Sequence, residues 1–188
     1  MTLKKTFLTL LFLLISSSHA INLEQDKKFG VEVNPFYLLI ITPGENSETM
    51  LSGTFSFFDH INGAEIAIPL HYMKMNSYKQ LTIDIHYRKF LNNQVGGFYL
   101  SGFGRVARLE GETTNDTEFN YAKQTKVGLG AGLGFRVFSD FGLYWGASFS
   151  LGRYLTNDNE NFGSNLFTIN DDAPYILDIE FFKFGYSF

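Results

Sequence analysis

The sequence contains no cysteine, which excludes disulfide bonds, zinc sites built from thiolates and a cysteine nucleophile. Charged residues make up only 18% of the 188 residues, and the net charge of −4 argues against a general nucleic-acid-binding protein. Proline occurs four times, and the 18 glycines follow no collagen period, so a fibrous protein is excluded. Hydrophobic residues (45%) and aromatic residues (17%) are too abundant for a disordered chain. The composition therefore predicts a single folded domain.

Long hydrophobic runs are scarce beyond the first 20 residues. The longest is 36–41, whereas a transmembrane helix needs about 20 apolar residues. The body of the chain therefore predicts no membrane-spanning helix.

The N-terminal segment has the pattern of a cleaved secretory signal peptide. Lys4 and Lys5 form a positive region, 7–15 is an apolar core, and small residues precede the expected cleavage site. We expect 1–20 to be the signal peptide and 21–188 to be the mature domain of an exported bacterial envelope protein.

The mature sequence divides into eight segments of alternating hydrophobicity, separated by turn residues. Most have 9 to 15 residues, and a tilted β-strand needs roughly 9–11 to cross a bilayer. Short connections alternate with longer ones, as in outer-membrane barrels. The fold class that this predicts is all-β, a single eight-stranded antiparallel up-and-down transmembrane β-barrel. The expected strands are 28–40, 50–58, 64–75, 81–91, 97–109, 124–138, 143–154 and 176–188.

The alternation also indicates which face of each strand meets lipid. In 124–138, large residues such as Leu129 and Leu133 share one face, and Gly130 and Gly132 lie on the other. Small residues fit a narrow barrel interior, whereas bulky apolar residues suit lipid. Lipid-facing aromatic residues are expected to form interfacial girdles. Those expected in the girdles are Tyr72, Tyr87, Trp145, Phe184, Tyr186 and Phe188.

The last strand ends in alternating aromatic residues, Phe182, Phe184, Tyr186 and Phe188. In this the sequence resembles the small eight-stranded outer-membrane β-barrels, the superfamily that includes the OmpA transmembrane domain, OmpX, NspA, OmpW and the lipid A deacylase PagL. The resemblance implies that these four residues are a C-terminal signal read by the barrel-assembly machinery. It also implies outer-membrane lipid and lipopolysaccharide as surroundings, and we expect a monomer.

The polar faces of the strands predict a charged interior. An isolated buried charge is costly, so charges in an interior only as wide as its side chains must pair or stay hydrated. We expect an ion-paired plug, with a narrow pore or ligand cavity as the alternative. The predicted network is Glu32, Glu65, Asp84, His86, Arg88, Arg105, Arg136 and Lys183, and the same pattern places Asn34, His71 and Lys126 inside.

No catalytic motif stands out. The PagL family carries a His-x-Ser-Asn motif, but His71 is followed two residues later by Met73, and His86 by Arg88. A metal site at the two histidines has only weak support. We expect no catalytic, cofactor-binding or metal-binding residues, and hence a non-enzymatic barrel with a structural or surface-interaction role. The alternatives are a narrow small-solute channel similar to OmpW and, with less support, a lipid A-modifying enzyme.

Two polar segments are candidate surface loops. Residues 110–123 contain four acidic residues, and 155–175 contain four more. We expect solvated loop tips. The alternatives are divalent cations that bridge these acids to lipopolysaccharide, or an adhesive surface patch; no calcium-loop pattern is present.

Overall fold

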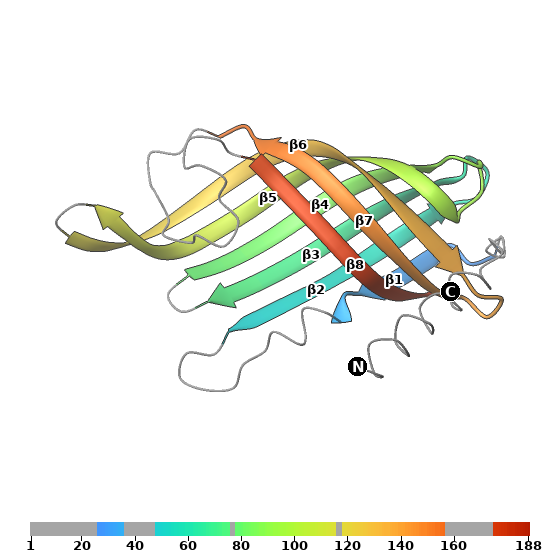
Figure 1. Cartoon of the computed structure of the whole chain (residues 1–188), viewed down its shortest axis with the longest axis horizontal. Coiled ribbons are helices and arrows are strands. Elements are labelled where there is room, and N and C mark those ends of the chain that lie inside the picture. Colours follow the sequence, from blue (N-terminus) through green and yellow to red (C-terminus); the bar gives the residue numbers. More distant parts are fainter. Residues whose placement is uncertain (1–25, 36–47, 76–77, 116–117, 157–174) are drawn as a thin grey trace, which may run out of the picture.

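The chain folds into a closed barrel of eight antiparallel strands, each hydrogen-bonded to the next, with the last strand closing on the first (Figure 1). The computed structural model describes residues 26–35, 48–75, 78–115, 118–156 and 175–188. For 112–115 and 118–122 it describes the backbone only. The strands are β1 (Phe29–Val33), β2 (Thr49–Asp59), β3 (Ala64–Met75), β4 (Tyr78–Phe90), β5 (Gly97–Asn115), β6 (Glu118–Phe138), β7 (Leu143–Tyr154) and β8 (Tyr175–Ser187). The predicted fold class is confirmed.

The two ends of the barrel differ. At one end lie the tight turns 60–63, 91–96 and 139–142, and Phe29 pairs there with Phe188 through both backbone hydrogen bonds. We call this the turn end. At the opposite end, which we call the hairpin end, β5 and β6 run on past the other strands (Figure 1).

Most strand boundaries agree with the sequence, and the exceptions have a common cause. β3 and β7 have the predicted bounds, but β4 starts at Tyr78, so only 76–77 separates it from β3. β1 is described as a strand over five residues, and 36–40 of the predicted 28–40 lies outside the described residues. Strand ends lie where the lipid-facing alternation fades, so the periodicity loses its signal there.

The predicted long loop 110–123 is wrong. β5 and β6 continue as a paired hairpin in which Glu110 opposes Lys123 and Asn115 opposes Glu118. This segment lacks the alternation of apolar and polar residues that marks the other strands, so its periodicity gives no strand signal. Threonine and aromatic residues in this segment nevertheless favour strands. Of the other predicted loop, 157–174 lies outside the described residues.

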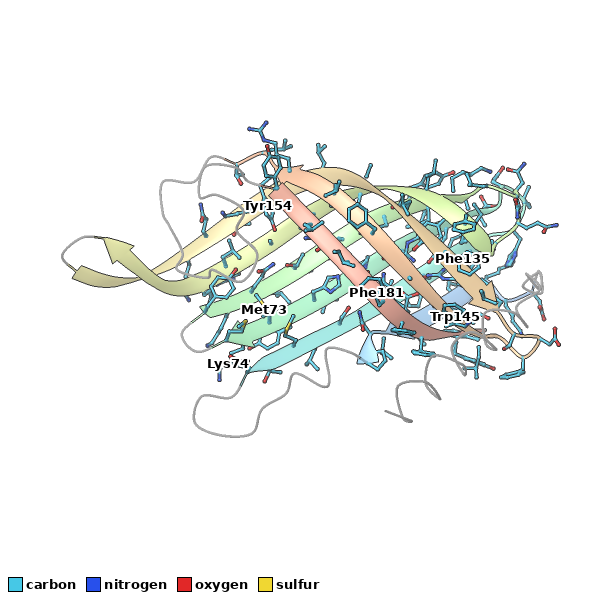
Figure 2. The ribbon with its side chains drawn as sticks, in the orientation of Figure 1. Met73, Lys74, Phe135, Trp145, Tyr154 and Phe181 are labelled. Atoms are coloured by element: carbon cyan, nitrogen blue, oxygen red, sulfur yellow. The ribbon has the colours of Figure 1, made fainter. Side chains whose placement is uncertain are left out.

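The outer face of the barrel is apolar along every described strand. Ile85 (62% exposed), Phe98 (62%) and Phe181 (59%) all point outward. At the turn end Phe135 packs between Phe98 and Trp145, with ring centroids 4.7 and 6.1 Å away (Figure 2). An aromatic group of this kind is typical of a membrane-interface girdle. Within the described residues, no helix is long and apolar enough to span a membrane.

β8 contains a bulge that changes which residues face inward. Gly146 opposes Lys183 whereas Ser148 opposes Glu180, so two residues of β8 lie across from Ala147. The backbone of Phe182 takes a left-handed conformation there, with φ of 60°. The predicted alternation through Phe182 is therefore interrupted, although the residues after it alternate as expected. Because of the bulge, Lys183 and Glu180 both face the interior although they are three residues apart.

Candidate functional site: the charged interior

All eight residues of the predicted network lie inside the barrel. Their side chains come from six different strands, and none of these residues is more than 7% exposed. Asn34 is also buried, and Lys126 lies 5.6 Å from the centre of the Tyr154 ring. The interior residues fall into two groups along the barrel axis.

The group nearer the turn end is centred on Arg136 of β6. Its guanidinium donates to Glu65 Oε2 at 2.5 Å and to Glu32 Oε2 at 2.7 Å. Arg88 Nη1 donates to the other oxygen of Glu65 at 3.0 Å, and Ser56 Oγ donates to the same oxygen at 2.5 Å. Glu65 of β3 thus joins three residues that come from three other strands, β2, β4 and β6.

A lysine of β8 extends this group. Lys183 Nζ contacts Glu180 and lies 3.6 Å from Glu32 Oε1. Ser148 Oγ donates to Glu180 Oε2 at 3.2 Å. We define the Arg136 cluster as its three acids and three bases: Glu32, Glu65, Glu180, Arg88, Arg136 and Lys183. With every group ionised, its formal charge is zero, which is the condition under which buried charges are tolerated.

The second group lies nearer the hairpin end and is centred on Arg105 of β5. Its guanidinium donates to Asp84 at 2.8 and 2.6 Å, a two-point contact, and to Asp178 at 2.6 and 3.3 Å. His86 lies 3.4 Å from Asp84, and its ring stacks on Phe103 at 5.0 Å. We call Asp84, His86, Arg105 and Asp178 the Arg105 cluster. Paired geometry of this kind is among the strongest ionic contacts in proteins.

An aromatic ring lies beneath each arginine. Arg136 lies over Tyr144 at 4.6 Å, Arg88 over Tyr99 at 5.3 Å and Arg105 over Phe103 at 5.6 Å. A positive charge is attracted to the face of such a ring, so the contacts add to the ion pairs.

Glycine makes room for these rings on the inner wall. A Cβ atom would lie 2.2 Å from the Tyr144 ring at Gly185, 2.3 Å from Tyr99 at Gly134 and 2.5 Å from Phe103 at Gly130. No side chain fits at these distances. The glycine-rich inner face predicted from the sequence is therefore filled by rings, which in turn support the arginines.

Aromatic side chains also close the interior at the turn end. Phe58, Phe138 and Tyr144 contact one another, with ring centroids 4.9 to 6.3 Å apart. Phe90 packs against Tyr99 at 5.3 Å. With Val95, these five rings form one buried hydrophobic cluster, which we call the aromatic cap. Large rings thus fill the interior at this end beside the glycines of the inner wall, and Arg136 lies over three of them.

Among the described residues, a cavity of about 120 Å³ lies near the hairpin end, bordered by β2, β3, β4, β5 and β8. Its lining includes Arg105, Asp178 and Glu180 as well as His71, Met50 and Met73. From the turn end to the hairpin end the interior thus contains the aromatic cap, the Arg136 cluster, the Arg105 cluster and the cavity.

Two carboxylates of the network were missed by sequence reasoning. Asp178 and Glu180 have even numbers, whereas Lys183, placed inside from the sequence, has an odd one. Strict alternation would put the two acids outside, and only the bulge in β8 allows both sets to face inward. The available signal was that strict alternation sets two acidic residues on the same face as Tyr186 and Phe188, because an acid is unfavourable on a face that meets lipid. Among the described residues, histidines and carboxylates do not gather in groups of three or more that could hold a metal.

These features define the class of fold: a closed barrel of eight antiparallel strands, with an apolar exterior and an ion-paired interior. No family model matches the sequence, and no curated protein matches it. Among solved structures, the N-terminal β-barrel domain of Pseudomonas aeruginosa OprF is similar, at 13% identity and a TM-score of 0.47, over 86% of this chain and 98% of that one. This match concerns the fold alone.

Proposed function

We propose that the protein is a non-enzymatic outer-membrane barrel with a structural or surface-interaction role, and that its interior is closed to solutes. The observation that carries this proposal is the succession of the aromatic cap and the charge-balanced Arg136 cluster across the barrel at the turn end. Solute passage would require several buried ion pairs to separate together, and breaking such a pair leaves an uncompensated charge.

The membrane location is supported by the outer surface. Large apolar side chains are exposed on all eight strands, which would be unfavourable in water over so large an area. The pattern of 1–20 supports export through a signal peptide, and the aromatic C-terminus supports delivery by the barrel-assembly machinery. Outer-membrane lipid and lipopolysaccharide would surround a monomeric barrel, whose β5–β6 hairpin extends beyond it at the hairpin end (Figure 1).

Single-channel recording in planar bilayers tests whether the interior is closed. The purified barrel should produce no discrete openings, while a heat-dependent shift in gel mobility verifies that the same sample is folded. Reproducible openings of defined size would refute a closed interior. They would instead support the channel alternative, for which the cavity at the hairpin end is the favouring observation.

If openings are seen, neutralising Arg88 should change their conductance or ion selectivity, because Arg88 belongs to the buried Arg136 cluster inside the barrel.

A separate measurement addresses enzymatic activity on lipid A. A strain lacking the protein should have the same lipid A acyl chains as its parent by mass spectrometry. An altered acyl pattern, restored by the wild-type gene, would contradict the non-enzymatic role.

A further inference from the structure

The methionines of the chain are concentrated at one place inside the barrel. The sequence has four, and all except Met1 lie near the hairpin end of β2 and β3, at 50, 73 and 75. Met50 and Met73 are direct partners in the β2–β3 register. Figure 2 shows Met73 near the end of β3 that lies away from the chain termini.

The register shows that these methionines belong to the inner face. Met73 pairs with Gln80 of β4, and Gln80 donates to the hydroxyl of Thr82 at 2.9 Å. Thr82 is only 1% exposed, so it faces the interior, and residues two apart share a face. Met75 follows Met73 by two residues and continues that face.

A histidine belongs to the same face. His71 precedes Met73 by two residues and pairs with Ser52 on one side and Thr82 on the other. Met50, His71 and Met73 border the same cavity. Directly opposed residues in a sheet have Cβ atoms about 4.5–5.5 Å apart, so the flexible thioethers of Met50 and Met73 can converge on one point.

Apolar packing does not account for this placement. Methionine is an ordinary filler of irregular apolar cores. Here, however, the methionines border a cavity whose lining contains Gln80, Thr82 and the charged Arg105 besides the apolar Leu51 and Tyr72. A methionine needed only for its hydrophobicity would suit the lipid face, where none of the three lies.

We propose that Met50, Met73 and His71 form a binding site for Cu(I), with Met75 as a further thioether within reach. Thioether sulfur and imidazole nitrogen are soft or intermediate ligands, and this set selects Cu(I) over hard cations such as Mg²⁺ and Ca²⁺. The site differs in kind from the histidine and carboxylate groups considered above, because sulfur supplies its main ligands.

Two carboxylates of β8 border the same cavity. Asp178 and Glu180 line it together with the methionines. Asp178 is paired with Arg105 and Glu180 with Lys183, so neither carboxylate is assigned as a ligand. The Oε1 atom of Glu180 is buried without a hydrogen-bond partner.

Competition for Cu(I) against a chromophoric chelator, under anaerobic reducing conditions, tests the proposal on the detergent-solubilised barrel. The wild type should bind one Cu(I) per chain. The double variant Met50→Leu/Met73→Leu keeps apolar volume but removes both sulfurs. Its affinity should fall at least roughly tenfold, because losing even an outer-sphere partner of a metal site costs about that much.

Histidine substitutions supply a matched pair. His71→Gln should weaken Cu(I) binding, whereas His60→Gln should leave it unchanged, since His60 lies in a turn at the opposite end and contacts the Lys27 carbonyl. Equal binding by the wild type and the double methionine variant would overturn the proposal, as would no binding by the wild type.

X-ray absorption on the wild type keeps the proposal testable if a variant fails to fold. Cu(I) bound as proposed should show sulfur among its nearest neighbours. Because the chain has no cysteine, any sulfur neighbour from the protein must belong to methionine. A first shell that contains only nitrogen or oxygen would refute the site.

Discussion

Replacing Arg136 with methionine is the most direct perturbation of the interior. Arg136 is 2% exposed, donates to both Glu65 and Glu32 and lies over the Tyr144 ring. Methionine keeps a long, flexible, apolar side chain but carries no charge and no donor. The Arg136 cluster would change from three acids and three bases to three acids and two bases.

The magnitude follows from the burial of the partners. Removing one member of a buried ion pair costs about 3–5 kcal/mol, because the other is left charged and unpaired. Here Glu65 keeps Arg88 and Glu32 keeps Lys183 at 3.6 Å, which limits the loss to the lower part of that range. Loss of the contact with Tyr144 adds roughly 0.5–2 kcal/mol. We therefore expect Arg136→Met to lower the free energy of unfolding by about 4 kcal/mol.

Urea-induced unfolding of the barrel in lipid vesicles measures this loss. Fluorescence of Trp145, the only tryptophan, reports unfolding, and gel mobility provides an independent measure of the folded fraction. The double variant Arg136→Met/Glu32→Gln restores the charge balance and should recover part of the loss. The reasoning is refuted if the single variant unfolds within about 0.5 kcal/mol of the wild type, the usual range for surface substitutions. It is also refuted if the double variant is less stable than the single one.

Two further predictions concern the inner wall and the outer face. Gly134→Ala should destabilise the barrel by about 1–3 kcal/mol in the same unfolding assay. The added Cβ would lie 2.3 Å from a buried ring, whereas Gly102→Ala, with no atom within 4 Å, should be nearly neutral; equal effects would contradict the ring-filled wall. Ile85→Lys, on the 62% exposed outer face, should cost about 2–4 kcal/mol if that face meets lipid. Ile61→Lys in a turn is its control, and a barrel that accepts both lysines equally would refute burial of the outer face in a bilayer.

The alternation of side chains carried the prediction of the fold and of most of the interior. Glu65, Arg88 and Arg136 were placed inside because each lies on the polar side of a strand with strict period two. That period is a property of a single strand and can be recognised without its neighbours. The same rule assigned Ile85 and Leu133 to the lipid face, where the structure has them 62% and 54% exposed.

The rule failed where contacts with other strands decide. The bulge in β8 reverses the alternation, so Asp178 and Glu180 were missed while Lys183 was found. The polar β5–β6 extension was mistaken for a loop because its sequence lacks the apolar–polar alternation that marks the other strands. Phe58 and Phe138 of the aromatic cap were missed because each follows another apolar residue near a strand end, where one residue decides the face.

By itself, the sequence determined the number of strands, the two faces along most of their length and the presence of paired charges inside. These follow from local composition, because apolar and polar environments on opposite sides of a strand select residues at every second position. Only the tertiary structure decided which charges pair, which rings lie beneath the arginines and where a cavity remains. Those features depend on register and on closure of β8 against β1, which bring together residues as far apart as Glu32 and Arg136. A partner that distant leaves no periodic trace in the sequence.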